Sequence, residues 1–300
     1  MSALLMLFAC LVLGMLVARF ARPPENMVNA LNWWVLRIAL PALVLELVPR
    51  LAISSHLWFP AATVWLGFLG AWLVFGFLGP RLGWSRGRTG TVILVCGLGN
   101  TTFLGYPMIE ALVGHDALGY AVVADQLGSF PILITLAVVV ANLYAGLTPH
   151  PAHIFKRIFT FPAFIALLVG IAVNLAGGWP TLVDHALAPL AGTLTPVALF
   201  SVGLRFKLNL GSRKMLGAAC LGWGWKLLVA PAMAVGLGLL AGVGGDIFMV
   251  GVLQAGMAPM VSATILANDH ELDPPLANSI LGIGIIMSLA TVPLIHLLLS

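Results

Sequence analysis

Residues 97–107 read GLGNTTFLGYP, and residues 254–262 read QAGMAPMVS. Each string lies inside a long apolar stretch and combines glycines with a proline. A proline removes a backbone donor and clashes with the preceding helical turn, and glycines lower the cost of leaving helical geometry. We therefore predict two interrupted apolar helices, with helix-breaking residues at Gly99, Gly105, Pro107, Gly256 and Pro259.

The composition around these strings is that of a membrane protein. Of the 300 residues, 61% are hydrophobic and 8% are charged, against roughly 45–50% and about 25% in soluble domains. So few charges cannot cover the surface of a soluble protein of this length. The apolar runs are continuous and do not alternate, so we predict an all-α membrane protein. The net charge of +4 comes from basic residues in short loops, so nucleic acid is not an expected partner.

Hydropathy predicts ten membrane-spanning helices joined by short connections. They cover residues 2–20, 28–49, 57–79, 90–113, 117–145, 160–177, 186–206, 215–241, 247–267 and 275–299. The interrupted strings fall in the fourth and ninth of these spans.

The basic residues predict the orientation. Eleven of the 14 Lys and Arg residues follow spans 1, 3, 5 and 7: Arg19, Arg22, Arg81, Arg86, Arg88, Lys156, Arg157, Arg205, Lys207, Arg213 and Lys214. The opposite face has only Arg50. This bias places the first set in the cytoplasm and both termini outside, which requires an even number of spans. The first segment lacks a basic start, so we interpret it as a spanning helix and not as a signal peptide.

An internal repeat is visible. Pro41 and Arg50 are nine residues apart, as are Pro196 and Arg205, and the two pairs are 155 residues apart. Similar offsets separate Gly14 from Gly170 (156), Pro107 from Pro259 (152) and Asp125 from Asn278 (153). Five spans per unit is an odd number, so the halves, residues 1–148 and 158–300, are predicted to be inverted relative to each other.

Matched breaks in inverted halves indicate a substrate site. Each break exposes the N-terminus of a half-helix, which has free amide donors and the positive end of a dipole, so the site is suited to an anion. The predicted substrate-binding residues are Asn100, Thr101, Thr102, Tyr106, Gln254, Met257 and Ser262. A plain proline kink with glycine packing is the alternative interpretation of either break.

Ionisable residues inside the spans are the next candidates, because a buried charge is costly and usually functional. Asp125 has three candidate roles: carrying a proton, pairing with a cation, or holding the broken helix through hydrogen bonds. We predict that Gln126, Ser129 and Asn278 act together with Asp125 in coupling or in support of the broken helix. Lys226 is expected to snorkel towards the cytoplasmic interface and Glu46 to lie near the outer one. The roles of these two residues and of Glu110 stay open.

Other site chemistries are not indicated. The seven histidines have no metal-ligand spacing, no dinucleotide-binding loop follows a strand, and no nucleophile–base arrangement is visible. Cys10, Cys96 and Cys220 are interpreted as small buried residues. We expect no cofactor, no metal and no enzymatic activity.

The strings GNTTFLGYP (99–107) and DQLGS (125–129) resemble those of the auxin efflux carrier family, and the resemblance extends over essentially the whole chain. Bacterial members are similar to malonate and malate permeases. The resemblance implies the fold of plant auxin carriers and bile-acid sodium symporters, in which spans 4 and 9 cross at their breaks. It implies a scaffold of spans 1, 2, 6 and 7, and a transport domain of spans 3–5 and 8–10 that moves as an elevator. It also implies homodimers in a bacterial inner membrane.

Two features depart from these relatives. The long central loop of the plant carriers is replaced by a short connection, and the acidic residues of the bile-acid symporters in span 9 are missing. Gln254, Met257 and Ser262 are neutral there. We predict a secondary transporter of small organic anions such as malonate, malate or an auxin-like carboxylate. An anion channel, a ligand sensor of the same fold and a sodium-coupled symporter are the alternatives, and proton or sodium coupling stays open.

Overall fold

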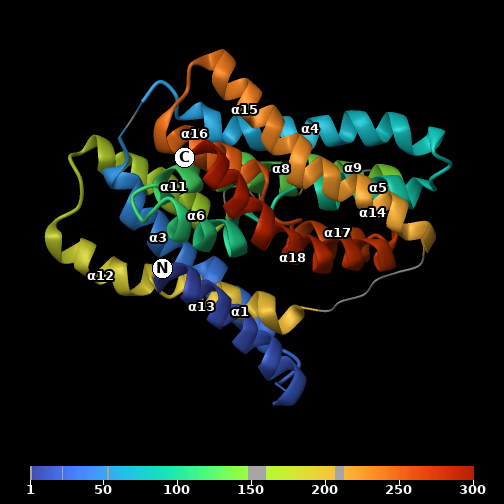
Figure 1. Ribbon diagram of the computed structural model, residues 1–300. Coiled ribbons are helices and arrows are strands. Elements are labelled where there is room, and N and C mark those ends of the chain that lie inside the picture. The colour runs from blue at the N-terminus through green and yellow to red at the C-terminus, as the bar shows by residue number, and fades with distance from the viewer. Residues whose placement is uncertain (1, 22, 53, 148–159, 207–212) are drawn as a thin grey trace. The chain divides into compact units, whose positions relative to one another are not determined.

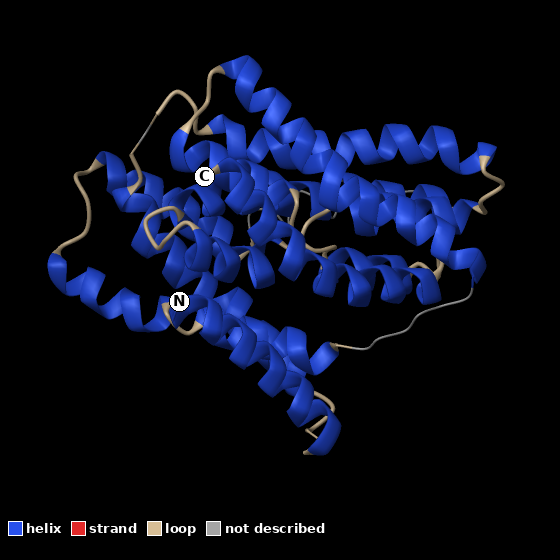
Figure 2. Cartoon of the chain, in the orientation of Figure 1, coloured by secondary structure: helices blue, strands red, loops and turns tan. Residues whose placement is uncertain are grey.

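The computed structural model describes residues 2–21, 23–52, 54–147, 160–206 and 213–300 (Figure 1). Throughout these ranges the chain is helical, with loops between helices and no strand drawn (Figure 2). The prediction of an all-helical protein is therefore confirmed. Several predicted cytoplasmic residues and the predicted boundary between the halves lie outside the described residues: Arg22, Lys156, Arg157, Lys207 and the segment 148–158.

Six helical segments are long and apolar enough to cross a membrane. They are Met27–Arg50, Trp58–Arg81, Leu118–Ala145, Thr181–Arg205, Met215–Ala241 and Pro274–Leu299. Shorter apolar helices cover Leu5–Phe20, Pro162–Leu175 and Gly245–Ala255. All nine segments fall largely within predicted spans, which supports an integral membrane protein.

The chain forms two compact units, each assembled from separate stretches of sequence. The first comprises Met1–Ser55, Thr102–Val122 and Phe155–Phe206, and the second comprises His56–Thr101, Val123–Ile154 and Lys207–Ser300. The predicted fourth span is thus divided between the units, after Thr101.

The first unit combines the N-terminal segment of the chain with two later segments. Its helices are α1 (Ser2–Phe20), α2 (Met27–Trp34), η1 (Val35–Ala39), α3 (Leu40–Leu47), η2 (Val48–Arg50), α6 (Tyr106–Leu112), α11 (Pro162–Leu175), α12 (Thr181–Ala191) and α13 (Leu194–Arg205). Helices α1 and α13 pack through glycines: a Cβ on Gly14 would lie 2.3 Å from the carbonyl oxygen of Phe200, and one on Gly203 would lie 2.2 Å from that of Leu11. Small residues let membrane helices approach this closely.

The second unit is built around α5 (Arg86–Gly97). Its other helices are α4 (Trp58–Arg81), η4 (Ala124–Ser129), α8 (Phe130–Ile134), α9 (Leu136–Ala145), α14 (Arg213–Gly224), η5 (Trp225–Val229), α15 (Ala230–Ala241), α16 (Gly245–Ala255), α17 (Val261–Asp269) and α18 (Pro274–Leu299). Residues 92–97 of α5 are fully buried, and α4, α9, α14, α17 and α18 all contact this helix. Helix α7 (Leu118–Val123) leads from the first unit into η4.

Four prolines follow a wide, π-helical turn. Pro41, Pro107, Pro131 and Pro231 each occupy the second position of the α-helix that begins where η1, η3 (Thr101–Gly105), η4 or η5 ends. A proline ring clashes with the carbonyl group four residues earlier in a regular α-helix. A π-turn widens the helix at that point, so the helix continues past the proline.

The cysteine prediction is partly wrong. Cys96 is buried, but Cys10 is half-buried and Cys220 is exposed. Both lie on apolar helices, and an outward position on a membrane helix is also apolar because it faces lipid. Hydropathy alone therefore does not separate buried from outward positions here.

Candidate functional site

Two apolar helical stretches are interrupted, and their interruptions meet within the second unit. Helix α5 ends at Gly97 and η3 begins at Thr101; α16 ends at Ala255 and α17 begins at Val261. In the gaps, the Asn100 amide donates to the Ala258 carbonyl (2.8 Å) and the Met260 amide donates to the Leu98 carbonyl (3.2 Å). These two bonds form an antiparallel bridge centred on Gly99 and Pro259. We call residues 98–100 and 258–260 the crossing.

The sequence of the crossing fits this geometry. In an antiparallel pair, the residues of a non-hydrogen-bonded position face each other while their neighbours make the hydrogen bonds. Pro259 has no amide hydrogen, and at this position none is required. Gly99 faces it without a side chain, so the two backbones approach closely.

Pro107 is not part of the crossing, contrary to the prediction that it breaks the fourth span. It occupies the second position of α6, after the π-turn η3. The chain is helical from Thr101 to Leu112, and Gly105 lies within this stretch. The π-turn accommodates Pro107 without a break in the helix. The residue that faces Pro259 at the crossing is therefore Gly99.

A buried polar cluster holds the chain just after the crossing. The Thr101 hydroxyl donates to Oδ1 of Asp125 (2.5 Å) and is 2.9 Å from the Ser129 hydroxyl. The Gln126 side chain donates to Oδ2 of Asp125 (2.8 Å). All four side chains are at most 2% exposed. Of the three roles considered for Asp125, these contacts favour holding the broken helix through hydrogen bonds.

Two amide side chains lie beside this cluster. Asn100 is 2% exposed, and Gln254 is fully buried and donates to the Thr101 carbonyl at 3.5 Å. The Oε1 atoms of Gln126 and Gln254 are buried and make no hydrogen bond within the described part of the chain. A buried polar atom without a partner is unusual and often marks the place of a ligand or water. Rotation of either amide presents an NH2 donor in place of the oxygen.

The other predicted site residues are distributed as follows. Met257 is buried beside the crossing, Gly256 is the C-cap residue that follows α16, and Ser262 is half-buried in the first turn of α17. Thr102 and Tyr106 are buried, but they belong to the first unit. Asn278 is exposed and accepts a hydrogen bond from Asn268 at 3.2 Å, so it is not part of the cluster around Asp125.

The prediction that Lys226 snorkels towards the cytoplasmic interface is wrong. Its side chain is 3% exposed and does not snorkel. A Cβ placed on Gly99 would lie 2.8 Å from Nζ of Lys226, so the ammonium group lies against the crossing. Sequence reasoning missed this, because a lysine in mid-span carries no signal of the direction in which its long side chain points.

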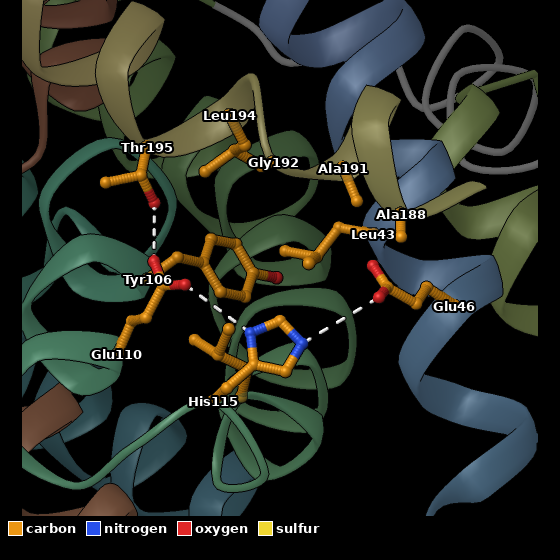
Figure 3. A pocket seen from close by; sticks show the side chains of 11 residues that line it. Leu43, Glu46, Tyr106, Glu110, His115, Ala188, Ala191, Gly192, Leu194 and Thr195 are labelled. Carbon is orange, nitrogen blue, oxygen red and sulfur yellow. Dashed lines mark hydrogen bonds and ion pairs between the residues drawn. The ribbon is translucent and has the colours of Figure 1, made fainter. Parts of the chain in front are cut away.

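A separate pocket of about 170 Å³ lies within the first unit (Figure 3). His115 points between two carboxylates there: its Nε2 is 3.8 Å from Glu46 and its Nδ1 is 3.4 Å from Glu110. The Thr195 hydroxyl donates to Glu110 at 2.8 Å. Glu46 is buried. Across the described ranges, no group of three His, Cys, Asp or Glu side chains is placed to hold a metal ion.

Comparison with known proteins places the chain among transporters. The family model described as "Membrane transport protein" matches residues 1–296. An uncharacterized transporter of Methanothermobacter thermautotrophicus is 28% identical over 90% of this chain and 88% of its own length. An uncharacterized transporter of Methanocaldococcus jannaschii is 26% identical over 98% of this chain and 97% of its own.

A plant protein is similar over the full length as well. Auxin efflux carrier component 8 of Arabidopsis thaliana is 24% identical over 100% of this chain and 97% of its own length. The match to the family model and these full-length similarities agree with the resemblance seen in the strings at 99–107 and 125–129.

Proposed function

The chain belongs to the membrane transport protein family that includes the auxin efflux carriers, and on that premise we propose that it is a secondary transporter of small organic anions. Malonate, malate and auxin-like carboxylates are the substrates to consider first. Transport proceeds by alternating access in an elevator-type motion.

The observation that carries this proposal is the crossing. Two apolar segments are interrupted at the same place, and backbone hydrogen bonds join them through Gly99 and Pro259. Non-helical backbone at membrane depth is tolerated only inside the protein or beside a water-filled cavity, and in secondary transporters it forms the substrate site. Asn100 and Gln254 supply neutral side-chain donors at this place.

The polarity of the crossing supports an anion. The half-helices that start at Thr101 and Val261 present amide groups and the positive ends of their dipoles. The Asp125 carboxylate would repel an anion, but Thr101 and Gln126 donate to its two oxygens. These hydrogen bonds within the cluster offset the negative charge of the carboxylate and so weaken its repulsion of an anion at the crossing.

The division into units supports an elevator. Predicted spans 1, 2, 6 and 7 fall in the first unit, and spans 3, 8, 9 and 10 fall in the second together with residues 90–101 of span 4 and 123–145 of span 5. We assign the scaffold to the first unit and the transport domain to the second. Ten spans in two inverted repeats, both termini outside the cytoplasmic membrane of a bacterium, and a homodimer complete the proposal.

The test is uptake and counterflow of labelled malonate, malate and indole-3-acetate in proteoliposomes containing purified protein. A carrier gives saturable uptake and accelerated exchange when unlabelled substrate is inside, whereas a channel gives neither. Asn100→Ala is expected to abolish uptake. Ser288→Ala is the matched control, because Ser288 is buried in the same unit and donates only to the Ile285 carbonyl of its own helix.

Two outcomes would contradict the proposal. The first is that wild-type protein, correctly folded and in sealed proteoliposomes, transports none of the three anions. This result would refute small organic anions as the substrate class. Uptake by Asn100→Ala at the rate of Ser288→Ala removes Asn100 from the site.

A further inference from the structure

Lys226 is a buried cation in the middle of an apolar segment. It lies in η5, within the membrane-length stretch Met215–Ala241, and is 3% exposed. A charged side chain at this depth is costly and is retained where it has a function and a compensating partner. Among the described residues, no carboxylate forms an ion pair with it.

The backbone around Gly99 locates the ammonium group. The position of a Cβ on Gly99 is 2.8 Å from Nζ of Lys226 and 3.2 Å from the carbonyl oxygen of Gln254. Gly99 follows the last residue of α5 by two positions, and Gln254 is in the last turn of α16. The ammonium group therefore lies beside Gly99, near the C-terminal ends of α5 and α16, where the helix dipoles are negative.

This is where a broken-helix transporter commonly holds a metal cation. Half-helix N-termini face the anionic substrate, whereas unwound carbonyls and half-helix C-termini coordinate Na⁺. We propose that the Lys226 ammonium group is a tethered cation that fills this position, so that the crossing binds no sodium and transport does not depend on it. The consequence for transport rests on the proposed function, whereas the charge compensation at the crossing does not.

Gly99 and Lys226 form a matched pair in this arrangement. Any side chain on Gly99 would occupy the space of the ammonium group and approach the Gln254 carbonyl at 3.2 Å. The location of Nζ where a Gly99 side chain would lie, just after the C-terminal end of α5, favours compensation of its charge by the negative helix end over direct contact with a substrate carboxylate. Shortening Lys226 would leave an unfilled space beside Gly99, near the negative end of α5, and we expect a small cation to enter it.

The test is the thermal stability of purified protein in detergent, at constant ionic strength, in N-methylglucamine, sodium, methylammonium or ethylammonium chloride. We expect the melting temperature of wild type to be the same in all four salts. Lys226→Ala should melt several degrees lower in N-methylglucamine chloride and recover in a saturable manner with methylammonium, ethylammonium or sodium. Leu227→Ala is the matched control, because it opens an apolar cavity on the same buried turn and no cation should rescue it.

Uptake gives the second readout. Wild-type uptake should be unchanged when sodium is replaced by N-methylglucamine, and Lys226→Ala uptake should rise with added amine or sodium. A sodium requirement of wild type, an undiminished melting temperature of Lys226→Ala, or equal rescue of Leu227→Ala would overturn the inference. If Lys226→Ala does not fold, Lys226→Met replaces it and the wild-type sodium test still decides.

The two proposals fail separately. Cation rescue of Lys226→Ala together with no uptake of any anion by wild type would leave the tethered cation in place and refute the proposed function. Saturable, sodium-dependent uptake by wild type would support the proposed function and refute the tethered cation.

Discussion

At the scale of single residues, Asp125 connects two segments of the second unit. Its carboxylate accepts from Thr101 at the start of η3 and from Gln126 on its own helix. A buried carboxylate that accepts hydrogen bonds from two side chains holds these side chains in place. The crossing therefore depends on a side chain 24 residues away in sequence.

Thr101→Val should destabilise the protein by about 1–3 kcal/mol, because the near-isosteric change removes the hydrogen bond that Thr101 donates to the buried Asp125 carboxylate. Chemical denaturation in detergent measures this difference, and uptake should fall with it. Thr264→Val is the control: Thr264 is also buried but donates only to the Met260 carbonyl four residues earlier. Equal stability of the two variants would show that the contact with Asp125 contributes nothing.

At the scale of elements, Asn174 on α11 joins two helices of the first unit. Its side-chain amide lies 2.9–3.1 Å from the carbonyl oxygens of Val48, Pro49 and Leu51. These carbonyl groups are at the end of the second predicted span, where the last carbonyl groups of a helix lack most of their intrahelical donors. The Val48 carbonyl also accepts from the Leu51 amide at 3.1 Å. The asparagine thus caps a helix of distant sequence.

Asn174→Ala should lower the free energy of unfolding by about 1–3 kcal/mol, since three carbonyl groups lose the hydrogen bonds of this half-buried side chain. The same denaturation assay tests it. Asn142→Ala is the comparison, because the Asn142 amide donates only to Val138 within its own helix. A loss for Asn142→Ala as large as that for Asn174→Ala would refute the capping role.

The contact between α1 and α13 yields a second prediction at this scale. Gly203→Ala places a methyl group 2.2 Å from the Leu11 carbonyl oxygen, and such overpacking costs about 1–3 kcal/mol. Gly236→Ala meets nothing within 4 Å and should stabilise its helix by about 0.5–1 kcal/mol. Melting temperatures that shift in the same direction in both variants would contradict this packing.

The sequence predicted the elements better than their breaks. Continuous apolar runs located the helices, because membrane helices are defined by length and hydropathy. Pro107 and Pro259 looked equivalent, yet only Pro259 lies at a break, since a π-turn precedes Pro107. Whether a helix widens or breaks at a proline depends on what packs around it, and a local string does not contain that information.

The candidate site was predictable to a similar degree. Asn100, Thr101, Asp125 and Gln254 are buried around the crossing, as polar residues next to breaks in apolar spans indicate. Lys226 and the exposed Asn278 were misjudged. In both cases the direction of a side chain decides the outcome, and that direction follows from tertiary packing.

At the scale of the whole molecule, the positive-inside bias predicts which loops face the cytoplasm. Leu82 follows α4 and Asp116 follows α6, and both are exposed. In a variant without Cys10, Cys96 and Cys220, we expect a cysteine at Leu82→Cys to react with a membrane-impermeant maleimide only in opened cells. Asp116→Cys should react in intact cells. The reverse pattern would contradict the proposed orientation.

Equilibrium binding of labelled malonate, malate and indole-3-acetate to purified protein tests the central claim most directly, because it separates the crossing from the transport cycle. Wild type and Ser288→Ala should bind at least one of these anions with the same affinity, and Asn100→Ala should bind it at least about tenfold more weakly, a loss of about 1.4 kcal/mol. Binding of none of them to wild type, or undiminished affinity of Asn100→Ala, would contradict an anion site at the crossing.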